Sequence, residues 1–221
     1  MKINKVNKII ILCLIVLSFA IAGVGLMMLS DIIPIHFGVD GKPDQFGSKY
    51  FILIFPGVIT LCGLSMLLVC KYANVSENYK KYLLLIGSLT TAMFVAVLTV
   101  FLVYGITYTE EMPAFDVTKI VMLTFGLVMI VMSNFMPKIE KNNTLGIKTS
   151  WSLYNEVTWQ KTHRFAGFVG VLCGLILLIS GMLFEEMVNI IIMVSTIGVY
   201  AISSTVASYF YYKEEKAKEI E

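Results

Sequence analysis

The sequence predicts an all-α, polytopic membrane protein with six transmembrane helices. Of its 221 residues, 57% are hydrophobic and 14% are charged, whereas soluble domains carry about 25% charged residues. A helix needs roughly 20 mostly apolar residues to cross a bilayer. Six runs of about that length contain no Asp, Glu, Lys, Arg or His, and they lie at residues 9–29, 50–70, 82–108, 120–136, 165–184 and 187–212.

The distribution of basic residues predicts the orientation of these spans. All but three of the 17 Lys and Arg residues lie before the first span, between the second and third, between the fourth and fifth, or after the sixth. The three exceptions are Lys42, Lys49 and Lys119. Because basic residues of short loops stay in the cytoplasm, we expect both termini to be cytoplasmic, which agrees with an even number of spans.

The first span is predicted to remain in the mature protein. A basic start before an apolar run would also suit a cleaved signal peptide, but this run of 21 residues exceeds the usual signal core of about 7–15 residues. We therefore expect a single six-helix membrane domain over residues 1–221. The four cysteines all fall within spans, show no CxxC spacing and are interpreted as small apolar residues.

Gly170 and Gly174 lie four residues apart in the fifth span, so they share one helix face. Small residues at that spacing let a neighbouring backbone approach closely. The sequence therefore predicts a packing surface here, and this surface would permit a homodimer.

The outer segment, residues 30–49, is one of two connections long enough to carry a site. Pro34 and Pro43 restrict its backbone and its glycines permit turns, so we expect a compact extracellular loop. His36, Asp40 and Asp44 could suggest a metal site, but no fourth ligand is evident. A hydrogen-bonding or pH-sensitive histidine is favoured instead, and we predict neither a metal nor a cofactor.

The inner segment, residues 137–164, is predicted to contain the start of a helix that continues into the fifth span. Asn155 can cap this helix, with Glu156 in its first turn. Glu156, Trp159 or Gln160, and His163 are then expected on one face, directed at a partner or other inner loops. An alternative stays open, in which Trp151, Tyr154 and Trp159 only anchor the helix at the membrane interface.

The spans favour neither a transporter nor an enzyme. Proton-coupled transport usually needs an ionisable group such as Asp, Glu, Lys, Arg or His at membrane depth, and the six runs contain none of these five residue types. The sequence also has no HExxH motif, no phosphate-binding loop and no nucleophile with a nearby base. A transporter or lipid-handling enzyme is therefore the least favoured class, and we predict that the protein is not an enzyme.

Two sets of residues together resemble the SdpI-like family of bacterial membrane proteins. The outer set is Pro34, His36, Phe37, Gly41 and Asp44. The inner set is Asn134, Asn142, Gly146, Lys148, Thr149, Trp151, Glu156, Trp159, Thr162, His163 and Arg164. The chain departs from the family pattern at Lys148, Ser150 and Ser152, where the family usually has arginine, proline and threonine.

The resemblance implies a multi-pass protein of the bacterial plasma membrane. Its function would be immunity of the producing cell to a secreted, membrane-active peptide toxin, with the outer set meeting the toxin. The alternative implied by the family is a signalling receptor whose inner segment sequesters a small DNA-binding autorepressor. On either expectation the partners are the lipid bilayer and a protein or peptide, with no direct contact to nucleic acid.

Overall fold

The computed structural model describes residues 2–38, 42–72, 76–109, 117–142 and 145–219. The chain forms two compact units, Met1–Ile120 and Val121–Glu221, and each is described by itself. Six helices in the described residues are long and apolar enough to cross a membrane. The six predicted spans are therefore confirmed, and the protein is a multi-pass membrane protein.

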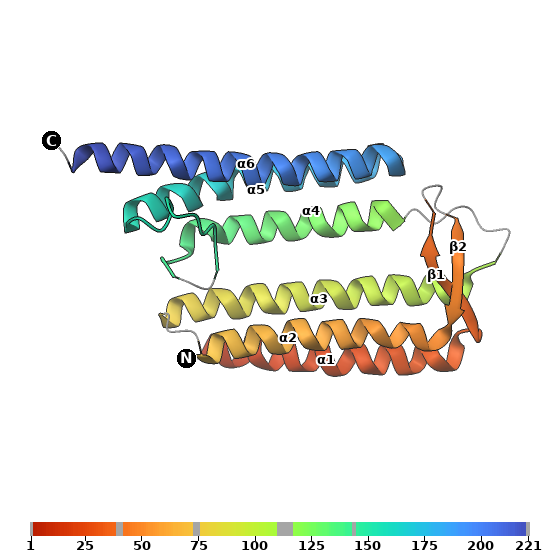
Figure 1. Ribbon diagram of the computed structural model, residues 1–221. Helices are drawn as coiled ribbons and strands as arrows, with labels where there is room; N and C mark the ends of the chain where they lie inside the picture. Colours follow the sequence, from red (N-terminus) through yellow and green to blue (C-terminus); the bar gives the residue numbers. More distant parts are fainter. Residues whose placement is uncertain (1, 39–41, 73–75, 110–116, 143–144, 220–221) are drawn as a thin grey trace. The chain divides into compact units, whose positions relative to one another are not determined.

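The first unit is built on three long helices, α1 (Lys2–Met28), α2 (Ile54–Tyr72) and α3 (Glu77–Thr107), which pack along one another (Figure 1). Small residues let them approach closely. A Cβ atom added at Gly63 would lie 2.9 Å from the Ile15 side chain, and one at Gly25 would lie 2.6 Å from Leu102. Aliphatic side chains therefore fill the space beside these glycines, which is how helices pack without a strong hydrophobic driving force.

The outer segment folds as a β-hairpin at the end of the unit where α1 finishes (Figure 1). Strand β1 (Ile32–Phe37) pairs antiparallel with β2 (Pro43–Ser48), and the 3-10 helix η1 (Lys49–Leu53) then leads into α2. The sequence predicted a compact loop but no strands. The Phe37 ring anchors the hairpin, because it packs edge-on against Phe101 and Tyr104 of α3 at centroid distances of 6.0 and 5.4 Å.

The second unit contains most of α4 (Val117–Phe135), together with the 3-10 helix η2 (Met136–Lys138), α5 (Glu156–Leu183) and α6 (Glu186–Lys218). Helices α5 and α6 form a tight antiparallel hairpin, as the short connection predicted. The buried Asn189 closes this hairpin: its Nδ2 donates to the Phe184 carbonyl at 2.9 Å, and its Oδ1 accepts from Ser180 Oγ at 2.5 Å.

The glycines of α5 pack against α4 of the same unit. A Cβ atom at Gly174 would lie 2.7 Å from the backbone oxygen of Gly126, and one at Gly170 would lie 2.0 Å from Ser133 Oγ. The predicted packing surface is thus present, but the suggestion that it serves a homodimer is wrong. Helix α4 already occupies the face that a second chain would need.

Candidate functional site

The inner segment forms a folded cap, which we define as residues 139–163 within the described part of the chain. Its centre is Trp159, whose side chain is fully buried. The indole Nε1 donates a hydrogen bond of 2.7 Å to the carbonyl of Ile139. This bond joins the first residue after η2 to the first turns of α5, so the tryptophan closes the segment into a loop.

His163 stacks on Trp159 and is equally buried, with 3.9 Å between ring centroids and 25° between planes. Its Nδ1 lies 2.9 Å from the carbonyl oxygen of Trp159, which can only accept, so Nδ1 carries the proton. Its Nε2 accepts the backbone N–H of Ile147 at 3.1 Å. Both nitrogens are therefore satisfied in the neutral ring, and His163 holds the loop in place.

Gly146 is the point where the loop passes over this stack. It has a φ of 113°, and it is the one residue with positive φ among those that the structure describes. An added Cβ atom would lie 2.3 Å from His163 Nε2 and 3.1 Å from the Trp159 ring. Only glycine suits both the left-handed backbone and this close approach.

Side chains of the loop hydrogen-bond its own backbone. Asn142 Nδ2 donates to the carbonyls of Glu140 and Leu145, and its Oδ1 accepts from the Leu145 N–H. Thr149 and Ser152 exchange bonds, because each hydroxyl oxygen accepts the other residue's backbone N–H at 2.9–3.0 Å. Such local bonds offer the backbone an alternative to regular structure, which explains a defined fold without a helix or strand.

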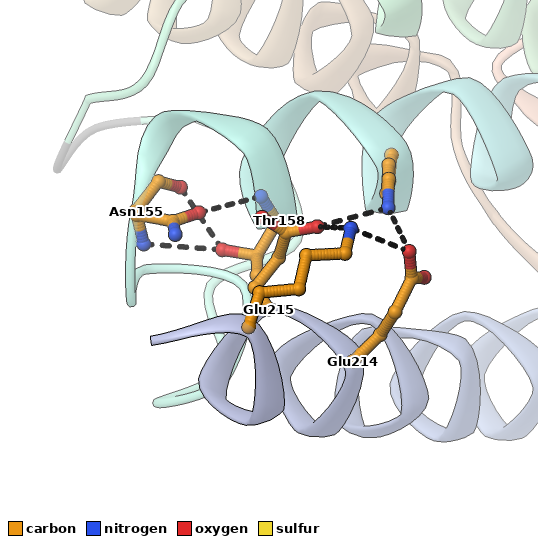
Figure 2. Close-up of polar contacts among 6 residues, drawn as sticks. Asn155, Thr158, Glu214 and Glu215 are labelled. Carbon is orange, nitrogen blue, oxygen red and sulfur yellow. Dashed lines mark hydrogen bonds and ion pairs between the residues drawn. The ribbon is translucent and has the colours of Figure 1, made fainter. Parts of the chain in front are cut away.

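The predicted cap of α5 is confirmed at Asn155. Its side chain accepts the Thr158 N–H at 2.8 Å, and Thr158 Oγ1 accepts the Asn155 N–H at 3.1 Å (Figure 2). This reciprocal arrangement satisfies two N–H groups that the helix start would otherwise leave unpaired. Glu156 follows in the first turn, as predicted.

The cap is also attached to the last turns of α6. Thr149 Oγ1 and Ser208 Oγ are 2.8 Å apart, and the Trp151 ring packs edge-on against Tyr209 at 5.1 Å. The Tyr154 hydroxyl donates to the Glu219 carboxylate, and this hydrogen bond raises the pKa of Tyr154. With 33 residues α6 is about 50 Å long, longer than the roughly 30 Å hydrocarbon core, so its end can reach beyond the bilayer.

A charged cluster joins the same two helices. Lys161 Nζ of α5 lies 2.7 Å from a Glu214 carboxylate oxygen and 3.0 Å from one of Glu215, and Lys218 contacts both carboxylates as well (Figure 2). Sequence reasoning missed these partners of the cap on α6. The run KEEKAKE after the sixth span was the available signal, because alternating charges beyond a span are typical of a solvated helix end.

The structure contradicts the expectation that Glu156, Trp159 and His163 share one face directed at a partner. Trp159 and His163 are buried, as is Thr162, whereas Glu156, Gln160 and Arg164 are exposed. The exposed residues are four apart and form one stripe on α5. Trp159 is likewise no interfacial anchor, because it lies in the centre of the cap. Of the remaining motif residues, Lys148 and Asn134 are exposed.

The hairpin holds the second set of predicted residues. His36 Nδ1 and Asp44 Oδ1 are 2.6 Å apart across the two strands, and both side chains remain about half exposed. Pro34, a residue of β1, is buried. Gly41 and Asp40 lie outside the described residues, and within the described ones no three His, Cys, Asp or Glu side chains gather as metal ligands do.

An ion pair missed in the sequence stabilises the base of the hairpin. Lys49 Nζ lies 2.9 Å from the Asp31 carboxylate, and the Lys49 N–H donates to the Asp31 carbonyl at 3.0 Å. The hydrogen bond from Lys49 lowers the pKa of Asp31. The pair joins the residues just before β1 and just after β2.

Comparison with known proteins connects each unit to a family model. Residues 138–210, which include the whole cap with α5 and much of α6, match the SdpI/YfhL protein family. Residues 13–60, which include the hairpin, match a domain of unknown function (DUF1648). No solved structure matches the chain.

Two similar proteins extend this comparison. The "Immunity protein SdpI" of Bacillus subtilis (strain 168) is 26% identical over 211 residues, which cover 96% of this chain and 97% of that protein. An uncharacterized protein of Archaeoglobus fulgidus is 40% identical over 43 residues, or 20% of this chain and 24% of that protein. The match of the cap and the similarity along almost the entire length show that this chain resembles the SdpI/YfhL protein family.

Proposed function

We propose that this protein gives the cell that makes it immunity to a secreted, membrane-active peptide, and that the β-hairpin is where the peptide binds. The observation that carries this proposal is the exposed His36–Asp44 pair on a hairpin held to α3 by Phe37. A rigid base beneath exposed side chains of mixed polarity is what recognition of a peptide requires.

The similarity to an immunity protein over 96% of the chain supports this function. The hairpin lies in one compact unit of the chain and the cap lies in the other. We propose no catalytic or transport step, because the apolar runs of the six spans carry no Asp, Glu, Lys, Arg or His.

The proposal requires the hairpin to face outward and both termini to face the cytoplasm. The excess of Lys and Arg at the opposite ends of the spans supports that orientation. This orientation is tested by fusing to the C-terminus a reporter that fluoresces only in the cytoplasm. A dark fusion that is nevertheless full-length would contradict the proposed topology.

The function is tested by survival. The protein is expressed in a sensitive bacterium, the peptide against which the Bacillus subtilis immunity protein protects is added, and the membrane potential is followed with a dye. Wild type and the matched variant Arg164→Ala, an exposed change in the other unit, should keep the potential, whereas His36→Ala should lose most of the protection. Equal killing with and without the wild-type protein would refute immunity to this peptide.

A second candidate function is capture of a small DNA-binding autorepressor by the cap. The exposed stripe of Glu156, Gln160 and Arg164 favours it, because Glu156 and Arg164 belong to the inner set but are not buried in the cap. Pull-down from cells should recover the repressor with wild type and fail with the Glu156→Lys/Arg164→Glu double variant. Alanine at the buried Trp159 or His163 would report on folding instead.

A further inference from the structure

The hairpin has one strand edge that is built to accept another strand. In the described residues the sheet has two strands, so β1 and β2 each have one edge that faces no neighbouring strand. Strand β1 carries the buried Ile33 and Pro34, whereas four of the six residues of β2 are exposed. Strand β2 is therefore the outward strand.

The register identifies which backbone groups point to that edge. Ile32 lies opposite Ser48, Ile33 opposite Gly47 and Pro34 opposite Phe46. In antiparallel pairs, hydrogen-bonded and non-hydrogen-bonded positions alternate. Because Lys49 N–H donates to the Asp31 carbonyl, the 31/49 and 33/47 positions are the hydrogen-bonded ones.

The 32/48 and 34/46 positions therefore direct their backbone groups away from the partner strand. On β1 this edge includes Pro34, which has no N–H and is followed by a bulge, so it is a poor template. On β2 the same rule directs outward the N–H and C=O of Phe46 and the N–H of Ser48. The edge of β2 is thus open where that of β1 is blocked.

Side chains next to the open edge suit an apolar peptide. Phe46 is 50% exposed, and its ring lies on the same sheet face as the side chain of Ser48, two residues along. Alternate residues of an added strand would pack on that ring while the backbone bonds to β2. A lipid or small solute does not offer backbone donors and acceptors that repeat every second residue, about 6.8 Å, along a strand.

We propose that an extended segment of the peptide binds by adding a third strand to the hairpin along the outward edge of β2. This inference rests on the proposed immunity function and names the way in which the hairpin recognises its partner. Strand addition gives affinity through main-chain hydrogen bonds and selects side chains at alternate positions. Phe46 would set the preference for an apolar residue.

Ser48 allows a sharp test. Its φ of −63° and ψ of 141° are those that proline adopts. Ser48→Pro therefore removes the outward N–H without straining the backbone or removing a bond between β1 and β2. Ser48→Ala is the matched control, because it loses the hydroxyl, which caps η1 weakly at 3.5 Å, but keeps the N–H.

Both variants are purified in lipid nanodiscs and titrated with the labelled peptide used in the survival test. Ser48→Pro should bind about tenfold more weakly, since it loses a hydrogen bond and leaves an acceptor of the peptide unpaired, while Ser48→Ala stays within about twofold of wild type. Should Ser48→Pro prove unfolded, Phe46→Pro is compared with Phe46→Ala instead. Both variants lose the ring, but only Phe46→Pro also loses the outward N–H, so it should bind more weakly than Phe46→Ala.

Three results would overturn the inference. Equal affinity of Ser48→Pro and Ser48→Ala, with wild type still protecting cells, would show immunity without strand addition. Equal affinity together with a change from dimer to monomer in Ser48→Pro would assign the edge to a second copy of this chain. Absence of both binding and protection in the wild type would refute the proposed function itself.

Discussion

Gly146 and His163 pack so closely that a single added carbon atom would not fit between them. A Cβ atom on Gly146 would lie 2.3 Å from Nε2 of His163, and that nitrogen already accepts the N–H of the next residue, Ile147. Glycine, histidine and the stacked Trp159 thus form one unit, although they are up to 17 residues apart in the chain.

Gly146→Ala should lower the free energy of unfolding by about 2–4 kcal/mol, because it combines a left-handed backbone with overpacking. Denaturation in detergent micelles followed by tryptophan fluorescence measures this directly, since both tryptophans lie in the cap. Gly198→Ala is the control, because a Cβ atom there meets nothing within 4 Å. Equal stability of the two variants would contradict the packing described for Gly146.

Trp159→Phe should lower the free energy of unfolding by about 1–3 kcal/mol. The change leaves the carbonyl of Ile139 without its donor but retains an aromatic ring beside His163. Trp159→Ala should cost about 3–5 kcal/mol, since it also leaves a cavity. Unfolding followed by circular dichroism separates the two. If both variants had the stability of wild type, Trp159 would be an interfacial anchor after all.

Gly174→Leu should prevent correct packing of α4 on α5, because the new side chain would start 2.7 Å from the backbone oxygen of Gly126. The measured result would be loss of monodisperse protein in gel filtration. Gly198→Leu, in open space on α6, should purify as wild type does. A well-folded Gly174→Leu protein that had changed only from dimer to monomer would restore the homodimer face.

Lys161→Gln should lower the melting temperature slightly in dilute buffer, because Lys161 bridges Glu214 and Glu215 at a partly exposed site. In about 1 M salt the difference should shrink, since the Debye length then falls to about 3 Å. Lys213→Gln, an exposed lysine near the same end of α6, serves as control. A salt-independent loss would assign Lys161 a packing role instead.

The spans were predictable because each apolar stretch of the chain inserts in a bilayer according to its own length and composition. A stretch such as residues 9–29 carries enough apolar surface by itself, whatever its neighbours are. The start of α5 was predictable for the same local reason, since Asn155 caps the helix with residues three positions away.

The hairpin was only partly predictable. Prolines and glycines indicated a compact loop, but IIPIHF and PDQFGS lack the alternation that identifies strands. Their pairing depends on Asp31 and Lys49, which are 18 residues apart, and on the aromatic contacts of Phe37 with α3. No local pattern encodes such contacts.

The sequence by itself determined which segments enter the membrane and which residues of the two connecting segments stand out from an apolar chain. The tertiary structure decided what those residues do. Spacing on α5 separates Glu156, Gln160 and Arg164 from Trp159 and His163, but only the loop folded over Gly146 shows which set is buried. Burial depends on neighbours remote in the chain, whereas helix formation and membrane insertion depend on residues close in sequence.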